Sequence, residues 1–587
     1  MFFEVQVPEE LESLTLPKLN PANAEIAIRE AERFLDYTPG YIPMSFYMEY
    51  RRTGNRTHYE SLYHEKRRAL GALLIGEIQE GKGRFLDKAI DVLYSILQET
   101  SWCIPAHYLY KRDSRTLMLP NTRRPVIDLF SAETAATLSV AYNVLKPILT
   151  EPDYRYLFEL IEDEIDDRIV KPYINDHFWW MGDGTSFINN WAPWCTMNMM
   201  LTFFLMPVDN VKRRKAFRQA CYTIDHFLKD YGIDGCCNEG AGYYHHAGLC
   251  MMNALMIMDE VSDGSVSFAF EDERIRNIAA YIMDMHVTGD WYINYEDCSA
   301  KPGRCGIREY LAGKVTHNEK LMAFAKKEWE QSNLREQYYM DGFSLYFRFL
   351  AHSYDSELED SPNRSFPRHD VYYKSNGVVV AERGRYVFAV KGGDNGDSHN
   401  HNDVSSIILY KDGKPVLIDI GVEEYTALTF SERRYEIWTM KSIYHQTLNF
   451  GDIEQKPGKE YSAENMTVDF GRDVRVSMDV EKAFGDERVR SYERNLCFGD
   501  YGLVISENAD TDLERVLTIM TAEPVIDNGG VLAIGKSAKV GFSIVPTEVE
   551  TEEFPIDDTK LNVAWGKGSK LYRTRIHFDR DFTWNVI

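Results

Sequence analysis

The sequence lacks the segments that mark secreted and membrane-spanning proteins. Its first residues, MFFEVQVPEELESL, contain no basic region followed by a long apolar core, which a signal peptide requires. No apolar run reaches membrane-spanning length, so we expect no membrane partner. The nine cysteines are an odd number and include no metal-type C-x-x-C pair, which predicts reduced thiols. We therefore expect a cytoplasmic protein; a signal removed from its N-terminus would make it secreted or periplasmic.

Positive charge is also in short supply. Lysine and arginine total 66 against 91 aspartates and glutamates, for a formal net charge of -25. This balance argues against a nucleic-acid partner, because phosphate binding needs a basic surface. A site for an acidic polymer would need a locally basic cleft within the acidic surface. The aromatic content of 13% suits a carbohydrate cleft and suits helix packing equally well, so it does not distinguish the two.

The chain is too long for one hydrophobic core, and its 587 residues predict two or more domains. From about Asn23 to about Leu350, apolar residues recur at helical spacing and strand-like alternation is scarce. This pattern predicts paired helices in a toroid or solenoid. The expected helices are Tyr59–Glu80, Phe85–Leu97, Ile127–Leu149 (entered through Asp128 and Ser131), Tyr154–Val170, Lys212–Tyr231, Leu249–Val261 and Ile275–Met285.

A change of period separates this helical part from the rest of the chain. Ser353–Asp370 is acidic and then rich in Pro, Ser and Arg, which predicts a linker. After it, alternating apolar residues predict an antiparallel β-sandwich of two or more sheets. We therefore predict a helical domain over 1–365 and a β-sheet domain over 366–587. The expected strands are Gly377–Ala381, Tyr386–Val390, Ser406–Tyr410, Pro415–Ile420, Met466–Phe470, Val474–Met478, Gly502–Ser506 and Ala538–Val545.

One stretch of the predicted sheet domain, Gly392–Gly421, is dense in polar residues. It reads GGDNGDSHNHNDVSSIILYKDGKPVLIDIG, a loop rich in Gly, Asn, Asp and His followed by a hairpin signal at Asp412-Gly413. A hairpin can bring its two ends close together, so His401 in the loop and Asp419 near the end of the returning strand can share a ligand. With a third side chain from elsewhere they make a plausible zinc site. The ordinary alternative is a polar turn with surface histidines.

Further polar and aromatic clusters lie in the predicted helical part. Trp179–Asn198 reads WWMGDGTSFINNWAPWCTMN, in which Trp offers stacking faces and Asn offers amide donors; an N-cap asparagine is the alternative. Asp234–Gly248 reads DGCCNEGAGYYHHAG and crowds a glutamate, two tyrosines and two histidines into one segment. Trp102–His107 reads WCIPAH, where a cleft-lining His and Trp or a buried Trp with a capping His are both consistent with the sequence.

Together these motifs resemble those of the heparinase II/III-like polysaccharide lyases. The likeness is carried by HNHND followed by an apolar strand, DGKP and LIDIG, by NNW at 189–191, by a segment like E-G-x-x-Tyr that begins at Glu239, and by Tyr-His ahead of Gln455. It covers the chain from about Tyr59 to Gln455. The resemblance implies a multidomain α+β protein, with an N-terminal (α/α) toroid followed by a C-terminal antiparallel β-sandwich. The change of period supports the same architecture independently.

The resemblance also implies roles for the candidate residues. Asn190 would neutralise the substrate carboxylate, so that negative charge can spread onto it as the neighbouring proton leaves. Tyr243, with Tyr244 as the alternative register, would give a proton to the leaving oxygen, and Tyr243, His399 or both would remove the proton at C5. A tyrosine has an ordinary pKa of about 10, so a base role needs a nearby positive charge or donor. The substrate-binding candidates are His107, Asn189, Trp191, Glu239, Tyr244, His246, Asn402, Arg434 and Tyr435.

Spacing and resemblance differ over the two loop histidines. His399 and His401 are two residues apart, so on a regular strand both would face one side and bind the same metal. The resemblance instead turns His399 towards the sugar and implies a structural zinc bound by His401, Asp419 and His445. This division requires an irregular backbone, which the glycine and asparagine around the histidines permit. We follow the resemblance.

The sequence thus predicts a lyase that cleaves uronic-acid-containing glycans, glycosaminoglycan-like or alginate-like, by β-elimination. The expected partner is an acidic poly- or oligosaccharide, no organic cofactor is implied, and a homodimer is left open. Two other classes stay open on the same scaffold. One is a non-catalytic acidic-glycan-binding protein. The other is a glycoside hydrolase, in which Glu239 with Asp234 or Asp397 would supply the carboxylate pair.

Overall fold

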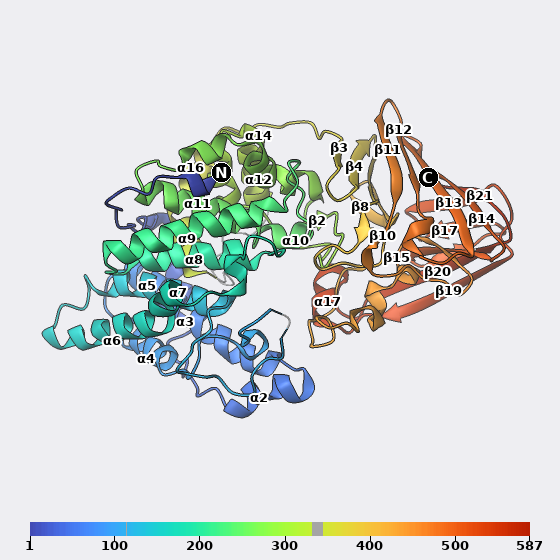
Figure 1. Cartoon of the computed structure of the whole chain (residues 1–587). Helices are drawn as coiled ribbons and strands as arrows, with labels where there is room; N and C mark the ends of the chain where they lie inside the picture. The colour runs from blue at the N-terminus through green and yellow to red at the C-terminus, as the bar shows by residue number, and fades with distance from the viewer. Residues whose placement is uncertain (113, 332–343) are drawn as a thin grey trace. The chain divides into compact units, whose positions relative to one another are not determined.

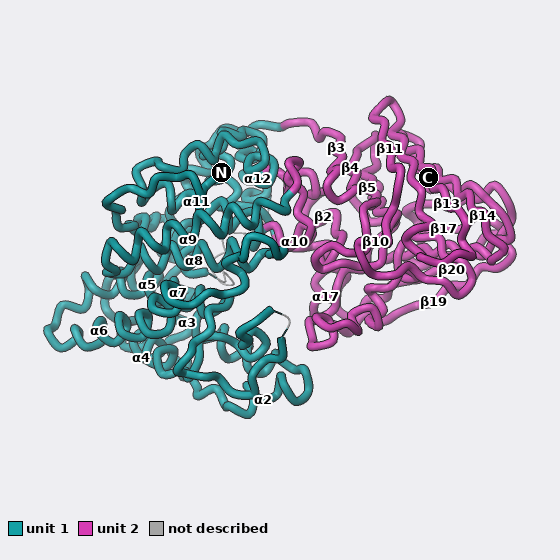
Figure 2. The backbone as a smooth tube through the Cα atoms, viewed as in Figure 1, with its two compact units in different colours: residues 1–231, 245–279, 304–365 teal, residues 232–244, 280–303, 366–587 magenta. Residues whose placement is uncertain are grey.

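The computed structural model describes residues 1–112, 114–331 and 344–587, which form two compact units. The first unit comprises Met1–Tyr231, His245–Ala279 and Arg304–Ser365, and the second comprises Gly232–Tyr244, Ala280–Gly303 and Phe366–Ile587 (Figure 2). The second unit therefore includes two short segments that precede residue 366. Both of these segments carry residues of the candidate site described below.

The first unit is built mainly of α-helices, joined by loops of varied length (Figure 1). In the described residues these helices and their neighbours are α1 (Ala24–Glu32), α2 (Met44–Thr53), α3 (Thr57–Glu80), α4 (Leu86–Leu97), α5 (Leu129–Leu145), α6 (Arg155–Ile165), α7 (Lys171–Asn175), α8 (Trp191–Leu205), α9 (Asn210–Lys229), α10 (Ala241–Tyr244, in the second unit), α11 (Gly248–Val261), α12 (Glu273–Met285, which carries residues of both units), α13 (Ile307–Val315), α14 (Glu319–Gln331) and α16 (Leu345–Asp360).

Local signals in the sequence account for where these helices begin and end. α5 begins at a capping box, in which the Asp128 carboxylate accepts from N of Ser131 and the Ser131 hydroxyl accepts from N of Asp128. α3 ends at Gly81, whose φ of +65° suits glycine. α8 is apolar around its whole circumference and packs against α5, α9 and α11. The predicted helical part is confirmed; its stretch at 332–343 lies outside the described residues.

The second unit is dominated by β-strands. They are β1 (His286–Thr288), β2 (Trp291–Tyr292), β3 (Val371–Tyr373), β4 (Val378–Arg383), β5 (Tyr386–Lys391), β6 (Asp394–Asn395), β7 (Ile407–Lys411), β8 (Lys414–Leu417), β9 (Leu448–Phe450), β10 (Gly458–Ser462), β11 (Glu464–Phe470), β12 (Val474–Asp479), β13 (Val489–Gly499), β14 (Gly502–Thr511), β15 (Arg515–Thr521), β16 (Val525–Asp527), β17 (Val531–Ile534), β18 (Ala538–Phe542), β19 (Glu548–Pro555), β20 (Lys570–Phe578) and β21 (Phe582–Val586).

Three antiparallel sheets and two short strand pairs result. The sheets have the orders β11-β12-β13-β14-β21-β18-β17-β16, β19-β20-β15-β9 and β3-β4-β5-β7-β8. They share one hydrophobic core: Phe388 of β5 stacks on Phe498 of β13 at 5.0 Å, and Leu517 of β15 is buried in the same cluster. This arrangement confirms the predicted antiparallel sheet domain.

The predicted hairpin lies in the five-stranded sheet. β7 and β8 are joined by Asp412 and Gly413, whose φ angles of +51° and +72° are those of a tight two-residue hairpin turn. The turn sets the register of the returning strand. Asp419 follows β8 directly, at the end of the hairpin where the polar loop enters β7.

The predicted linker is wrong over its first half. α16 continues to Asp360, and only residues 361–370 lack regular structure. The acidic run is helical because its inner face packs against the rest of the first unit. Leu358 is buried there, and the buried Asp355 accepts hydrogen bonds from Asn20 and Asn23. Across the described residues, no helix is both long and apolar enough to span a bilayer.

Candidate active site and metal centre

The polar loop between β6 and β7 holds both histidines but turns them in different directions. His399 has a φ of +60°, a left-handed conformation that is uncommon for a residue other than glycine. His401 is fully buried, whereas His399 keeps 10% of its side chain exposed. The irregular backbone that the resemblance requires is therefore present, and the regular strand that would align the two histidines is not.

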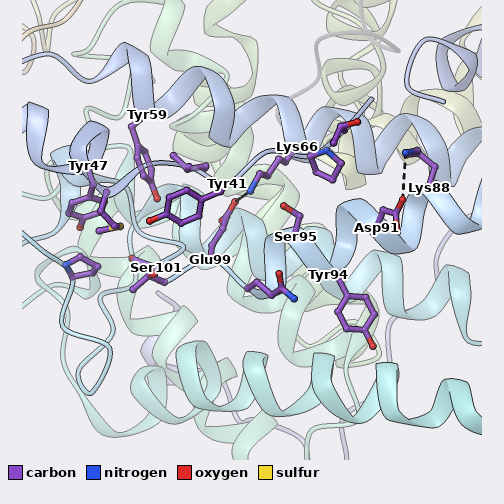
Figure 3. Close-up of a pocket in the computed structure, with 17 residues that line it drawn as sticks. Tyr41, Tyr47, Tyr59, Lys66, Lys88, Asp91, Tyr94, Ser95, Glu99 and Ser101 are labelled. Atoms are coloured by element: carbon purple, nitrogen blue, oxygen red, sulfur yellow. Dashed lines mark ion pairs between the residues drawn. The ribbon is translucent and has the colours of Figure 1, made fainter. Parts of the chain in front are cut away.

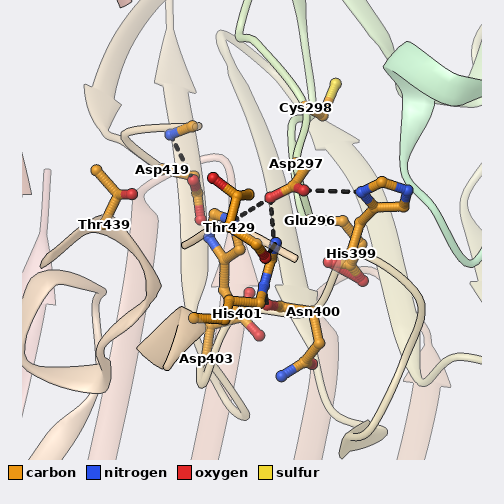
Figure 4. A network of polar contacts seen from close by, with 12 residues as sticks. Glu296, Asp297, Cys298, His399, Asn400, His401, Asp403, Asp419, Thr429 and Thr439 are labelled. Carbon is orange, nitrogen blue, oxygen red and sulfur yellow. Dashed lines mark hydrogen bonds and ion pairs between the residues drawn. The ribbon is translucent and has the colours of Figure 1, made fainter. Parts of the chain in front are cut away.

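Both histidines bind one carboxylate, that of Asp297 (Figure 4). Nδ1 of His399 donates to Oδ2 at 2.8 Å, and Nε2 of His401 donates to Oδ1 at 3.1 Å. Arg434 also donates to Oδ1, at 2.5 Å. Burial alone raises the pKa of Asp297, but these donors outweigh it and hold that pKa well below its usual range. Asp297 is thus a buried anion that fixes both rings.

Tyr243 packs against the ring of His399. The ring centroids are 4.2 Å apart and nearly parallel, and the Tyr243 hydroxyl lies 2.8 Å from that of Tyr425. Nε2 of His399 lies 3.2 Å from Oε2 of Glu239, so both ring nitrogens face carboxylates. Burial lowers the pKa of His399, but the contacts with Asp297 and Glu239 outweigh it and raise that pKa to about 8. The imidazolium is therefore the favoured form at neutral pH.

Three cationic side chains lie in this part of the second unit, beside the carboxylates of Asp297 and Glu239. Besides His399 and Arg434, Lys560 of α17 (Thr559–Trp565) lies over the ring of Tyr425, with Nζ 3.8 Å from its centroid. Burial lowers the pKa of Lys560 to about 8.

His401, Asp419 and His445 converge on one point and are completely or almost completely buried. Each offers a ligand atom within 4.8 Å of the others. Nδ1 of His401, Oδ2 of Asp419 and Nδ1 of His445 have no hydrogen-bond partner among the described residues. Nδ1 of His445 lies 3.0 Å from Oδ2 of Asp419, but without hydrogen-bond geometry. Buried polar atoms are rarely left unsatisfied, so these three atoms need a common partner.

The opposite atom of each of these side chains is already held. Nε2 of His401 donates to Asp297, Nε2 of His445 donates to the carbonyl of Thr439 at 3.1 Å, and Oδ1 of Asp419 accepts from N of Gly421 at 2.8 Å. Metal-binding histidines are typically oriented by such outer contacts to a carboxylate or a carbonyl. The donor set and its supports therefore fit a bound cation of the Zn²⁺ type.

Two buried cations hold the loops that carry these groups. Nζ of Lys391 lies 2.8 Å from Asp403 and 3.0 Å from Glu296, the neighbour of Asp297. Arg494 of β13 donates to the carbonyls of Ser405 and Gln446 at 2.8 and 2.9 Å. The loop of His401 and the segment of His445 are thus tied to one strand of the sandwich.

The first unit holds the remaining main candidates. Asn190 occupies the N-cap position of α8, but its side chain makes no capping hydrogen bond, so capping does not explain the residue. The ring of Trp191 contacts that of His107, with centroids 4.6 Å apart. Nδ1 of His107 bonds to Asp128 at 2.8 Å, and Oδ1 of Asn189 accepts from N of Trp191 at 3.3 Å. The predicted binding residues of this unit therefore form one cluster.

Three residues predicted to contact substrate have other partners. Arg434, predicted to hold the acidic sugar, donates to Asp297 and to two backbone carbonyls and is 9% exposed. Asn402 is 4% exposed and donates to a backbone carbonyl. The hydroxyl of Tyr435 accepts from Asn400 at 3.1 Å and remains partly exposed. Arg434 and Asn402 therefore support the loop from within.

The register of the two tyrosines follows from their burial. Tyr244 is 0% exposed and packs on interior rings, which argues against contact with substrate, whereas Tyr243 is the one that meets His399. α10 ends at Tyr244, two residues before His246. His246 stacks on Trp194 at 4.3 Å, and burial lowers the pKa of its imidazole to about 3.

Asp297, Tyr425 and Lys560 were not found from the sequence. Asp297 stands in NYEDCSAK, Tyr425 in GVEEYTAL and Lys560 near the start of a short C-terminal helix, and none of these stretches carries a recognisable spacing. The adjacent acidic pair at 296–297 next to Cys298 was the one available signal. Only the fold brings these residues to the histidine loop.

Comparison with known families bears on this geometry. Residues 367–491 match the family model described as Heparinase II/III-like, C-terminal. The chain therefore carries a heparinase II/III-like C-terminal segment. This segment includes the polar loop, the hairpin and all three residues of the buried His-Asp-His cluster, and the resemblance read from the sequence is confirmed. No curated protein matches the chain.

Solved structures share the fold of this chain over nearly its whole length. A structure of heparinase III matches with a TM-score of 0.65 and 13% identity, covering 100% of this chain and 88% of that one. The heparan sulfate lyase HepC from Pedobacter heparinus matches with a TM-score of 0.53 and 10% identity, covering 97% and 83%. The Streptomyces coelicolor A3 chondroitin AC lyase in complex with chondroitin sulphate matches with a TM-score of 0.55 and 10% identity, covering 97% of this chain and 80% of that one. These matches confirm the helical toroid followed by antiparallel sheets.

Proposed function

We propose that the protein is a lyase that cleaves uronic-acid-containing glycans by β-elimination. The observation that carries this proposal is the stacked pair of Tyr243 and His399, with His399 held between two carboxylates and Tyr243 bonded to a second tyrosine hydroxyl. The solved structures of the same fold include a heparinase III and a chondroitin AC lyase. We propose a glycosaminoglycan as the substrate class.

In this reaction, a base removes the proton at C5, and the C4–O4 bond breaks to leave a C4=C5 double bond. Both nitrogens of His399 face carboxylates, so neither offers a lone pair for that proton. Tyr243 is the remaining acceptor, and a hydrogen bond from Tyr425 together with the cationic ring of His399 stabilises its phenolate. Tyr243 then returns the proton to the leaving O4. His399 is thus a source of positive charge in this scheme.

Other predicted residues bind and neutralise the sugar acid in this proposal. Asn190 donates from its amide to the C6 carboxylate, which stabilises the negative charge as the C5 proton leaves. His107 and Trp191 offer a polar edge and an aromatic face to a neighbouring sugar ring. Glu239 and Asn189 are positioning residues for His399 and Trp191 respectively.

We assign a structural zinc to His401, Asp419 and His445. The metal would cross-link the polar loop, the end of the hairpin and the segment that carries His445. No step of the elimination needs it. The support is the set of three buried, unsatisfied ligand atoms whose opposite atoms are already bonded. On the sequence alone, we also propose a cytoplasmic location and a homodimer.

The carboxylate pair that a hydrolase would use is engaged elsewhere. Glu239 contacts His399, and Asp234 accepts from both N and Oγ of Ser375. Burial raises the pKa of Asp397, the other carboxylate considered with Glu239, to about 6, but Glu239 itself is held by His399. A purely binding protein has no need for the Tyr243 and Tyr425 hydroxyl pair.

The test is an ultraviolet absorbance assay with a panel of acidic glycans, including heparan sulfate, chondroitin sulfate, hyaluronan and alginate. A lyase produces an unsaturated sugar that absorbs, a hydrolase produces reducing ends without absorbance, and a binding protein produces neither. Tyr243→Phe should abolish the absorbance, and the buried Tyr244→Phe is its matched control. New reducing ends without absorbance on any substrate would refute the proposal.

A further inference from the structure

The helical unit contains a cavity of about 520 Å³ among α2, α3, α4 and the loops that flank them (Figure 3). Both lysines of its wall are paired with carboxylates: Nζ of Lys66 lies 3.3 Å from Glu99, and Nζ of Lys88 lies 3.5 Å from Asp91. These charges are balanced without a ligand. A cluster at the start of α13 differs, because a buried carboxylate oxygen of Glu309 makes no hydrogen bond among the described residues.

This cluster consists of His245, Cys305 and Glu309, all in the first unit. His245 stands in the loop ahead of α11, whereas Cys305 and Glu309 lie four residues apart across the start of α13, which packs against α11. Cys305 and Glu309 are 0% exposed, and His245 keeps 15% of its side chain exposed. Each residue offers a ligand atom within 4.8 Å of the others, as in the buried His-Asp-His cluster of the second unit.

The contact between His245 and Glu309 has the spacing of two ligands on one metal. Nδ1 of His245 lies 3.2 Å from Oε1 of Glu309, but without hydrogen-bond geometry. A tetrahedral Zn²⁺ with bonds of about 2.0–2.1 Å holds its nitrogen and oxygen ligands roughly 3.3 Å apart. A buried carboxylate oxygen is rarely left without a bond, so this geometry indicates a partner shared by both side chains.

The surroundings of the cluster hold its members in place. Oε2 of Glu309 accepts from N of Gly306 at 2.7 Å, so the opposite carboxylate oxygen is the one that faces the cluster. Arg308 donates to the backbone carbonyl of His245 at 3.0 Å and to Oδ1 of Asn253 at 2.8 Å, which ties the loop of His245 to α11 and α13. Outer contacts of this kind orient the ligands of metal sites.

We propose that His245, Cys305 and Glu309 bind a further structural Zn²⁺, which joins the start of α13 to the loop that enters α11. Thiolate, imidazole and carboxylate are all ligands of Zn²⁺, and the thiolate disfavours Mg²⁺ and Ca²⁺, which take oxygen ligands. Cys305 releases its thiol proton to solvent when it binds the ion. Its thiolate and the carboxylate of Glu309 then balance the two positive charges of the ion in a buried site. Water completes the tetrahedron.

The test is titration of metal-free, full-length protein with Co²⁺, which takes the place of Zn²⁺ and reports its ligands by absorbance. A thiolate on Co²⁺ gives an intense charge-transfer band in the near ultraviolet, which nitrogen and oxygen ligands do not give. The His-Asp-His cluster contains no thiolate, so its occupancy does not contribute to this band. We expect the band to appear, to saturate as Co²⁺ is added, and to be removed by Zn²⁺.

Variants assign the band to its residues. Cys305→Ser should abolish it, because a hydroxyl replaces the thiolate. Cys250→Ser is the matched control and should retain it: Cys250 is equally buried, and its Sγ donates to the backbone carbonyl of His245 at 3.4 Å, but it is not a member of the cluster. Glu309→Gln keeps the shape of the side chain and removes its charge. It should weaken Co²⁺ binding at this site by at least about tenfold, since loss of even an outer contact costs about 10–100-fold.

The decisive results do not depend on the proposed lyase activity. Absence of the band from the folded parent protein would overturn the site and leave His245 and Glu309 as an ordinary ion pair. Persistence of the band in folded Cys305→Ser would also overturn it. If Cys305→Ser does not fold, unchanged Co²⁺ affinity of the band in Glu309→Gln would refute the proposed ligand set.

Discussion

Replacing Asp297 by asparagine tests the centre of the histidine network. Three donors converge on its two carboxylate oxygens: His399 on Oδ2, and His401 and Arg434 on Oδ1. Asparagine has nearly the same shape but one acceptor oxygen, and its amide group would face one of the donors. The side chain should turn its oxygen to His401 and Arg434, which leaves Nδ1 of His399 opposite an NH₂ group.

The structure sets the size of the expected effect. Arg434 is buried, and Asp297 is the one carboxylate to which it is seen to bind in the described residues. Removing one partner of a buried ion pair costs roughly 3–5 kcal/mol. For a unit of this size, each kcal/mol lowers Tm by about 2–4 °C, so Asp297→Asn should lower the Tm of the second unit by about 6–20 °C. Loss of the contact that orients the His399 ring should also reduce activity by about 10–100-fold.

Thermal unfolding, elemental analysis and the absorbance assay measure these effects on one sample. The matched control is Asp412→Asn, which breaks an exposed Asp-Arg pair with Arg385 on the hairpin of the same sheet. Exposed ion pairs contribute little to stability, so this variant should have the same Tm as the parent protein and keep its activity. If Asp297→Asn also keeps the parental Tm, metal and rate, Asp297 does not organise the site.

Three further predictions follow from the same geometry. His445→Ala should lose the metal and lower Tm, whereas His399→Ala should keep both and lose activity; release of metal from His399→Ala would mean that the two loop histidines bind it together. Tyr243→Phe should fold normally and lose turnover, because only the hydroxyl is removed, while a dead Tyr244→Phe beside an active Tyr243→Phe would shift the register by one. Titration of denatured, unreduced protein should find close to nine thiols, since none of the nine cysteines forms a disulfide in the structure; recovery of only a few would refute a reducing location.

The sequence predicted those elements whose signals are local. The capping pair Asp128 and Ser131 marked the start of α5, and Asp412-Gly413 marked the β7–β8 turn, because in both cases residues within a few positions of each other decide the conformation. Strands β19 and β20 were missed. Their charged residues pair across the strands, as Glu552 does with Arg573, and this hides the apolar alternation that a single sequence can show.

The same distinction applies to the candidate site. His401, Asp419 and His445 were predicted because they stand in motifs, and the structure brings their ligand atoms together. Arg434 was predicted to face the sugar from the resemblance, because an arginine in a loop carries no information about its partner. That partner, Asp297, lies 137 residues away, so only the tertiary fold could reveal that its charge is already used.

The bridge that Asp297 makes between His399 and His401 has a thermodynamic consequence. If the metal on His401 changes the affinity of the neighbouring site for an acidic glycan, then the glycan must change the affinity for the metal by the same factor. The two equilibria share one carboxylate, so neither can be perturbed alone. If the metal strengthens glycan binding, a glycan bound beside His399 should slow the loss of metal to a chelator; if the metal weakens it, the glycan should speed that loss.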